Sequence, residues 1–162
     1  DRNGWFHTGD AGYLKDSHLY LTERIKDLFK TSNGKYISPQ ALETKLAIDR
    51  YIDQIAVIAD ERKFVSALIV PVYGFVKDYA KEKGIAYSNM DELLQHSKIQ
   101  ALFRARIDTL QQQFAHYEQV KRFTLLTEPF SMERGELTNT LKLKRSVVAK
   151  NYKGLIDKMY EE

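Results

Sequence analysis

Hydrophobic and polar residues follow two different periods along this chain, and the changes between them mark its expected elements. Residues 12–22 alternate between apolar and polar around the turn at 16–17, which predicts a β-hairpin. Two nearly continuous apolar runs, 55–59 and 65–72, are rich in β-branched residues and separated by four charged ones. They predict two antiparallel strands that are buried on both faces. A third strand is predicted over 121–127.

Apolar residues at helical spacing account for most of the remaining chain. Ser38 and Pro39 supply an N-cap and a proline for the first turn of a helix. The predicted helices span residues 39–48, 73–83, 90–96, 98–118 and 145–160. The longest carries one apolar stripe from Ile99 to Tyr117, which we assign to the core rather than to a cofactor site. The fold class is therefore α+β: a small three-stranded sheet covered by helices and preceded by a β-hairpin.

A charged junction separates the hairpin from the first helix. Six of the thirteen residues from 23 to 35 are charged, and apolar residues are few. The segment contains Asn33-Gly34, two residues that tolerate the positive φ of a tight turn. The junction is expected to be solvated and not part of the core.

The composition narrows the class of protein only a little. The chain has 162 residues, a hydrophobic fraction of 43% and no cysteine, which fits one domain in a reduced, cytoplasmic compartment. Its net charge of +3 does not by itself indicate nucleic acid or a membrane surface. Because the chain begins with turn residues and no initiator methionine, we expect it to be a fragment of a longer protein.

Three short motifs carry the candidate chemistry, and each has an ordinary structural explanation. Thr8-Gly9-Asp10 is compatible with a simple turn, but Asp10 could accept hydrogen bonds from the two hydroxyls of a ribose. Arg24 on its own would be a solvated charge. Lys142 would ordinarily belong to a solvated basic strip together with neighbouring cations.

Taken together, the order and spacing of these motifs resemble the C-terminal portion of an AMP-forming long-chain fatty acid–CoA ligase of the adenylate-forming superfamily. The resemblance rests on Gly4-Trp5-x-x-Thr8-Gly9-Asp10, on the junction at 23–35, and on the segment Leu137–Arg145. It covers essentially the whole chain. It implies a division into 1–25, the tail of a large adenylating domain, and 26–162, a C-terminal lid domain.

The resemblance also implies roles for the junction residues. Asp10 and Arg24 would bind the nucleotide, the arginine reaching ribose and phosphate oxygens. Lys26 matches the hinge about which the lid rotates. The loop that lines the path of coenzyme A is matched by Lys30, Asn33 and Gly34. Asn33-Gly34 departs mildly from the more common Gly-Gly of the superfamily.

Lys142 matches the lysine of the last superfamily motif. Its ammonium would bridge the fatty carboxylate and the α-phosphate of ATP and offset the repulsion between two anions as adenylation proceeds. The widespread form of that motif is Thr-x-x-Gly-Lys, and this chain has Leu141 in place of the glycine. The neighbouring Lys144 and Arg145 are expected to hold the loop or contact solvent.

The implied reaction has two steps: carboxylate and Mg-ATP give acyl-adenylate and pyrophosphate, and coenzyme A then displaces AMP. ATP with Mg²⁺ and coenzyme A are thus substrates of the intact enzyme, none held tightly by the fragment, which alone is expected to be inactive. Its partner is the N-terminal adenylating domain of the same chain, with no role for nucleic acid and a peripheral membrane location of the intact enzyme left open. Two alternatives remain: the lid of a sibling enzyme that acts on aryl or short acids or uses a carrier-protein acceptor, and a stand-alone basic binding module.

Overall fold

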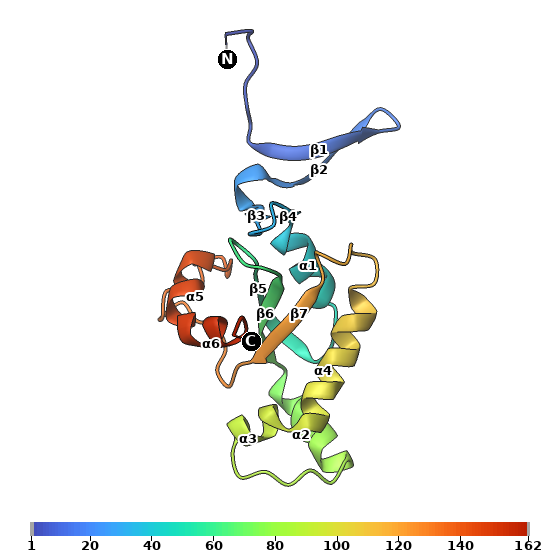
Figure 1. The fold of residues 1–162 in the computed structure, drawn as a ribbon, viewed down its shortest axis with the longest axis vertical. Helices are drawn as coiled ribbons and strands as arrows, with labels where there is room; N and C mark the ends of the chain where they lie inside the picture. The colour runs from blue at the N-terminus through green and yellow to red at the C-terminus, as the bar shows by residue number, and fades with distance from the viewer. Residues whose placement is uncertain (1, 162) are drawn as a thin grey trace.

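The computed structural model describes residues 2–161, apart from the side chains of Thr22 and Glu23. Figure 1 shows two parts: a hairpin at the N-terminal end, and a larger lobe that holds a central sheet and the helices. The α+β class predicted from the sequence is confirmed.

The central sheet contains the three predicted strands. They are β5 (Ile52–Ile58), β6 (Val65–Pro71) and β7 (Val120–Leu125), in the order β5-β6-β7. β5 and β6 pair antiparallel, as predicted, and β7 runs parallel to β6. Every residue of β6 is buried, which explains its nearly uninterrupted apolar sequence.

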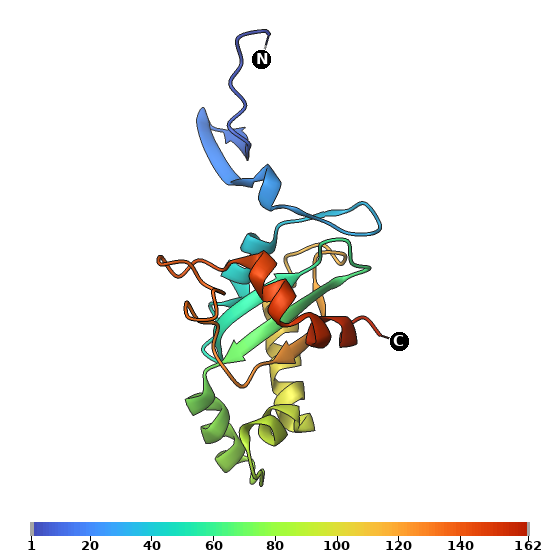
Figure 2. The same cartoon turned by 90° about the vertical axis from the view of Figure 1, so that its left-hand side faces the viewer.

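Two layers of helices cover the two faces of the sheet. One face packs against α1 (Pro39–Leu46), α2 (Tyr73–Glu82), α3 (Met90–Gln95) and α4 (Ser97–Leu110). The other face packs against α5 (Arg145–Asn151) and α6 (Lys153–Lys158), which Figure 2 shows lying across it. Along β6, Ala67 and Ile69 contribute to the first cluster, and Leu68 and Val70 to the second. The strand is therefore apolar on both sides because both sides are covered.

Local signals in the sequence fix the start of two helices. The Ser38 hydroxyl accepts the Ala41 N–H at 3.3 Å, and Pro39 occupies the first turn of α1. At α3, Asn89 accepts the Glu92 N–H at 2.9 Å, and the Glu92 carboxylate accepts the Ser88 N–H at 2.7 Å. This arrangement resembles a capping box, with Ser88 in place of Asn89 as the donor to the glutamate.

The prediction that the longest helix continues to residue 118 was wrong, because α4 ends at Leu110. The Gln111 side chain turns back onto the sheet, where it accepts the Val120 N–H at 2.8 Å and donates to the Val120 carbonyl at 3.4 Å. Phe114 still packs against the core from the following turn, but Tyr117 is exposed. The assignment of the apolar stripe to the core therefore holds as far as Phe114 and was wrong at Tyr117.

The prediction of one continuous helix over 145–160 was also wrong. The structure divides it into α5 and α6, with Tyr152 between them at φ −104° and ψ 18°. Tyr152 packs edge-on against Phe130, with 5.7 Å between ring centroids. That contact turns the chain so that Ile156 and Met159 reach the same apolar cluster as Val148.

The hairpin consists of β1 (Asp10–Lys15) and β2 (His18–Arg24), joined by the predicted turn at Asp16 and Ser17. Both turn residues have positive φ, 50° and 63°, which suits a two-residue hairpin loop. Tyr13 and Tyr20 stack across the strands with 5.1 Å between ring centroids. Large apolar side chains remain exposed on this part, at Trp5, Phe6, Leu14, Leu19 and Leu21.

Tyr160 fastens the C-terminal end of the lobe to the sheet. Its hydroxyl lies 2.8 Å from the Ser66 hydroxyl and 3.1 and 3.0 Å from the carbonyls of Ile58 and Phe64, which share its single proton. Tyr160→Phe is expected to lower the free energy of unfolding by about 1–2 kcal/mol, because it removes these bonds at nearly constant volume. Urea unfolding of the two proteins measures the difference, and equal midpoints would contradict it.

Candidate functional site

Lys142 lies in the long connection between β7 and α5, at the end of a tight turn. The strands of this turn meet in an antiparallel bridge between Leu137 and Leu143. Inside that bridge, the Thr138 N–H donates to the Lys142 carbonyl at 2.8 Å, and the Thr138 hydroxyl accepts the Lys142 N–H at 3.0 Å. The Leu141 N–H donates to the Thr138 carbonyl at 2.9 Å. Three hydrogen bonds to one threonine thus fix the backbone beneath the lysine.

The same turn accounts for the departure at Leu141. This residue has φ 60°, in the left-handed region where a glycine would cost nothing. A leucine there costs on the order of 1 kcal/mol. The backbone therefore keeps the form that glycine would give, and the hydrogen bonds to Thr138 hold Leu141 in it.

The Lys142 side chain is exposed. Within residues 2–161 it forms no ion pair with a carboxylate. Arg145 differs, because its guanidinium is paired with both carboxylate oxygens of Glu43, one of them at 2.7 Å. Glu43 also accepts the Val57 N–H at 2.8 Å, so Arg145 ties the start of α5 to α1 and β5. The cations of this segment therefore differ: Lys142 and Lys144 are exposed, whereas Arg145 is a structural cation.

Glu136 was not singled out from the sequence, yet it is fully buried. Its Oε2 accepts the Ser131 N–H at 3.0 Å, and its Oε1 lies 3.1 Å from Asn151 Nδ2. Arg134 Nε lies 3.1 Å from each of the two oxygens. Its own carbonyl accepts the Lys144 N–H at 2.7 Å. The only hint in the sequence was its place just before the Leu137–Arg145 segment.

The protonation of Glu136 should affect stability. Burial by itself raises the pKa of this carboxyl, but hydrogen bonds from Arg134, Asn151 and the Ser131 amide outweigh burial and hold the pKa below its ordinary value of 4.5. A lowered folded-state pKa stabilises the fold above pH 4.5, and that contribution is lost as the pH falls further.

We therefore expect Glu136→Gln to flatten the decline in the free energy of unfolding below pH 4.5. Denaturant unfolding across a pH series measures this slope for the variant and the unchanged protein. Glu128→Gln removes an exposed carboxylate near the same arginine and serves as the control. Parallel curves for Glu136→Gln and the unchanged protein would contradict the expectation.

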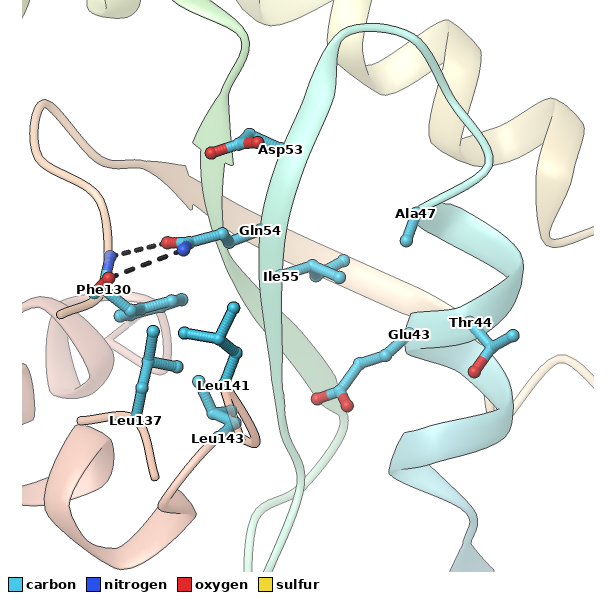
Figure 3. Close-up of a pocket in the computed structure, with 10 residues that line it drawn as sticks. All are labelled: Glu43, Thr44, Ala47, Asp53, Gln54, Ile55, Phe130, Leu137, Leu141 and Leu143. Atoms are coloured by element: carbon cyan, nitrogen blue, oxygen red, sulfur yellow. Dashed lines mark hydrogen bonds between the residues drawn. The ribbon is translucent and has the colours of Figure 1, made fainter. Parts of the chain in front are cut away.

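The inner side of the turn borders a hollow of about 330 Å³ between the loop, β5 and α1. Figure 3 shows Leu137, Leu141 and Leu143 gathered there beside Phe130. Gln54 holds the base of the loop, since its side chain accepts the Phe130 N–H at 2.6 Å and donates to the Phe130 carbonyl at 3.5 Å. The loop is thus fixed at its base and presents its lysine at its tip.

The structure brings Asp10 and Arg24 together at the open end of the hairpin. They are paired across β1 and β2, and Arg24 Nε lies 3.5 Å from an Asp10 carboxylate oxygen. A hollow of about 320 Å³ is lined by Thr8, Gly9, Arg24, Ile25 and Lys26. Lys26 is in a single 3₁₀ turn, η1 (Ile25–Asp27), whose first N–H donates to the Gly9 carbonyl at 2.8 Å. The predicted nucleotide residues and the predicted hinge are therefore neighbours.

The predicted coenzyme A loop lies between two short strands, β3 (Phe29–Lys30) and β4 (Tyr36–Ile37). Gly34 has φ 75°, as the tight turn predicted there requires, and its N–H donates to the Thr31 carbonyl at 2.8 Å. The Lys30 carbonyl accepts the Glu61 N–H at 2.9 Å, and Asn33 donates to the Lys63 carbonyl at 3.4 Å. The turn between β5 and β6 therefore supports this loop.

These groups do not form one site within the lobe. Figure 2 shows the β3–β4 loop and the loop between β7 and α5 extending from different sides of it. The third group, Asp10 and Arg24, belongs to the hairpin, which lies away from the lobe in Figure 1. Across residues 2–161 there is no cluster of three or more metal-ligating side chains, and no helix is long and apolar enough to span a membrane.

A small α+β lobe with a three-stranded sheet and helices on both of its faces is the fold of the C-terminal lid of an adenylation domain. The chain superimposes on the adenylation domain of a carboxylate reductase from Mycobacterium chelonae with a TM-score of 0.79 and 25% identity, covering 100% of this chain and 24% of that one. The fold is also shared with the adenylation domain of the carboxylic acid reductase from Segniliparus rugosus in complex with AMP, at a TM-score of 0.78 and 21% identity over 99% of this chain and 24% of that one.

The chain belongs to the AMP-binding enzyme C-terminal domain family, whose model matches residues 26–162. It is 34% identical to the peroxisomal long chain acyl-CoA synthetase 7 of Arabidopsis thaliana, over 100% of this chain and 24% of that protein. It is 35% identical to the long-chain-fatty-acid–CoA ligase 5 of Rattus norvegicus, over 99% of this chain and 24% of that protein. The chain thus spans about a quarter of the length of these relatives.

Proposed function

We propose that this chain is the lid of an AMP-forming long-chain fatty acid–CoA ligase, with residues 1–25 belonging to the large adenylating domain. The observation that carries the proposal is the exposed Lys142 on a turn fixed by three hydrogen bonds, in a chain that belongs to this family. The start of the family match at residue 26 supports a boundary at Lys26. The names of the curated relatives support a long-chain acid and coenzyme A as substrates.

In this proposal, Lys142 acts by placing charge. Its ammonium bridges the acid carboxylate and the α-phosphate of Mg-ATP and offsets the charge that develops during adenylation. The Lys142 loop and the loop at Lys30, Asn33 and Gly34 extend from different sides of the lobe, which supports a mechanism in which they face the active site one after the other. A rotation about Lys26 between the two half-reactions would bring each loop in turn to the active site.

The proposal is tested with the intact enzyme. ATP-dependent pyrophosphate release and thioester formation are measured with long-chain, short-chain and aryl acids, each with coenzyme A as acceptor. Long-chain acids should give the highest kcat/KM and an acyl-CoA product. Adenylation without transfer to coenzyme A, or a preference for aryl or short acids, would identify a sibling enzyme instead.

That sibling remains the second candidate because the structural neighbours include carboxylate reductase adenylation domains. A stand-alone basic binding module is less well supported, since Arg145 is paired with Glu43 and Lys153 with Asp157. Tight binding to a generic polyanion that weakens steeply with salt would favour it.

A further inference from the structure

We propose that Glu136 is a positioning residue for Lys142, holding the two strands of its loop in the geometry that adenylation requires. The inference rests on the proposed function, because it assumes that Lys142 serves the adenylation step. It adds to that function a residue that makes no contact with substrate and acts through the loop.

The contacts of Glu136 join three parts of the chain. Its carboxylate accepts hydrogen bonds from Ser131 and Arg134, which precede it in the loop, and from Asn151 at the end of α5. Its backbone N–H donates to the Ser131 carbonyl at 2.9 Å, and its carbonyl accepts the Lys144 N–H on the outgoing strand at 2.7 Å. One buried residue therefore sets the spacing between both ends of the loop and the helix that follows.

This restraint passes to Lys142 through a short path. Leu137, the next residue, forms the bridge with Leu143. Thr138 follows, and it holds Lys142 by its hydroxyl, its N–H and its carbonyl, the last through Leu141. A shift at Glu136 would move the turn, because the path consists of the peptide bonds from Glu136 to Thr138 and of the hydrogen bonds that Thr138 makes with Leu141 and Lys142.

Stability alone is a weak explanation for a carboxylate at this place. Withdrawing a charge from water costs several kcal/mol, and a buried ion pair is often no more stabilising than apolar residues of similar volume. The advantage of a carboxylate is directional, since it accepts several donors at once from fixed directions. The donors here lie in the loop segment before Glu136 and at the end of α5, on the two sides of the Lys142 turn.

The decisive variant is Glu136→Gln in the intact enzyme. The amide nitrogen keeps the volume but confronts the donors of Arg134 and Asn151 with another donor. The rate of adenylation should fall roughly tenfold to a hundredfold, as for other small misplacements of a catalytic group. Thioester formation from supplied acyl-adenylate should be unchanged, because that step uses the other face of the lobe.

Glu128→Gln is the matched control. Glu128 pairs with the same Arg134 at 3.2 Å, but its side chain is 74% exposed. This variant removes the same charge from the same arginine without disturbing the loop, and both half-reactions should keep their rates. If it slows adenylation as much as Glu136→Gln does, the charge on Arg134 rather than the position of the loop is responsible, and the inference is overturned.

A double variant distinguishes an effect of Glu136 on the position of Lys142 from a general loss of enzyme activity. If Glu136 acts through Lys142, then Glu136→Gln should add no further loss of adenylation to Lys142→Ala. Additive losses, or equal losses in both half-reactions, would overturn the positioning role while leaving the proposed function intact. Should Lys142→Ala alone fail to slow adenylation selectively, the proposed function itself fails, and the role of Glu136 fails with it.

Asn151→Ala keeps the inference testable if Glu136→Gln does not fold. Asn151 is exposed and donates only one bond to the carboxylate, so its removal should be tolerated. Adenylation should slow by a smaller factor, again without an effect on thioester formation. An unchanged adenylation rate would count against Glu136 as the positioning residue.

Discussion

Replacing Lys142 with alanine in the intact enzyme is expected to slow adenylation about a hundred- to a thousandfold, the usual loss for one well-aimed group that stabilises charge in the transition state. The fatty carboxylate and the α-phosphate are both anionic, and the ammonium is the group proposed to lie between them. Thioester formation from pre-made acyl-adenylate should continue at nearly the native rate, since the proposed rotation about Lys26 would turn the Lys142 loop away for that step.

The two half-reactions are measured separately, as pyrophosphate release in a single turnover and as acyl-CoA formation from supplied acyl-adenylate. Lys144→Ala is the matched control, because Lys144 is exposed on the same loop and is held only through its backbone. Equal losses in both half-reactions would remove the assigned role from Lys142. So would a loss in the control as large as that in Lys142→Ala.

Stability should not contribute to this result. The Lys142 side chain is exposed and forms no ion pair within the described residues, and the turn beneath it is held by backbone atoms and by Thr138. Exposed substitutions of this kind usually change the free energy of unfolding by less than about 0.5 kcal/mol. A lost adenylation rate in Lys142→Ala therefore reports on chemistry.

The central strands could be predicted from the sequence because their burial leaves a direct trace in composition. β6 is apolar at almost every position since helices cover both faces, and no surface helix would have that pattern. The C-terminal end of α4 and the break at Tyr152 could not be predicted, because they depend on contacts with residues outside the helix. Gln111 leaves the helix to bind Val120, and Tyr152 turns the chain against Phe130.

The residues of the candidate site also fall into those that the sequence could indicate and one that it could not. Lys142, Asp10 and Arg24 lie in short motifs whose spacing is visible in the sequence, so they could be identified before the structure. Glu136 could not, because its importance comes from donors at residues 131, 134 and 151 that converge only in the folded chain. A buried acidic residue looks the same in a sequence as an exposed one.

Leu141 shows how a departure from a motif can keep the geometry of the motif. Sequence alone presents the missing glycine as a weakness in the resemblance. In the structure, Leu141 has φ 60°, and the bonds made by Thr138 on either side hold it there. The turn is therefore specified by its hydrogen bonds, and the residue before the lysine is free to carry a side chain that lines the hollow in Figure 3.

Asp10→Asn should affect the enzyme differently from Lys142→Ala, because Asp10 is proposed to bind the ribose of the nucleotide and not to offset the developing charge. A carboxylate accepts from both hydroxyls of a ribose, whereas an amide has one acceptor and presents a donor to the other hydroxyl. Hydrogen bonds to a charged group contribute about 1.5–3 kcal/mol. Losing one is expected to raise the KM for ATP about tenfold to a hundredfold.

Both half-reactions should be weakened in Asp10→Asn, since in the proposed reaction the AMP portion is present in both steps. Arg24 should amplify the effect, because its Nε lies 3.5 Å from the Asp10 carboxylate and would lose its charged partner. Asp27→Asn, at an exposed position in η1 next to Lys26, is the control and should leave the KM for ATP unchanged. A loss confined to adenylation, or an unchanged KM with a lower kcat, would show that Asp10 does not bind the ribose.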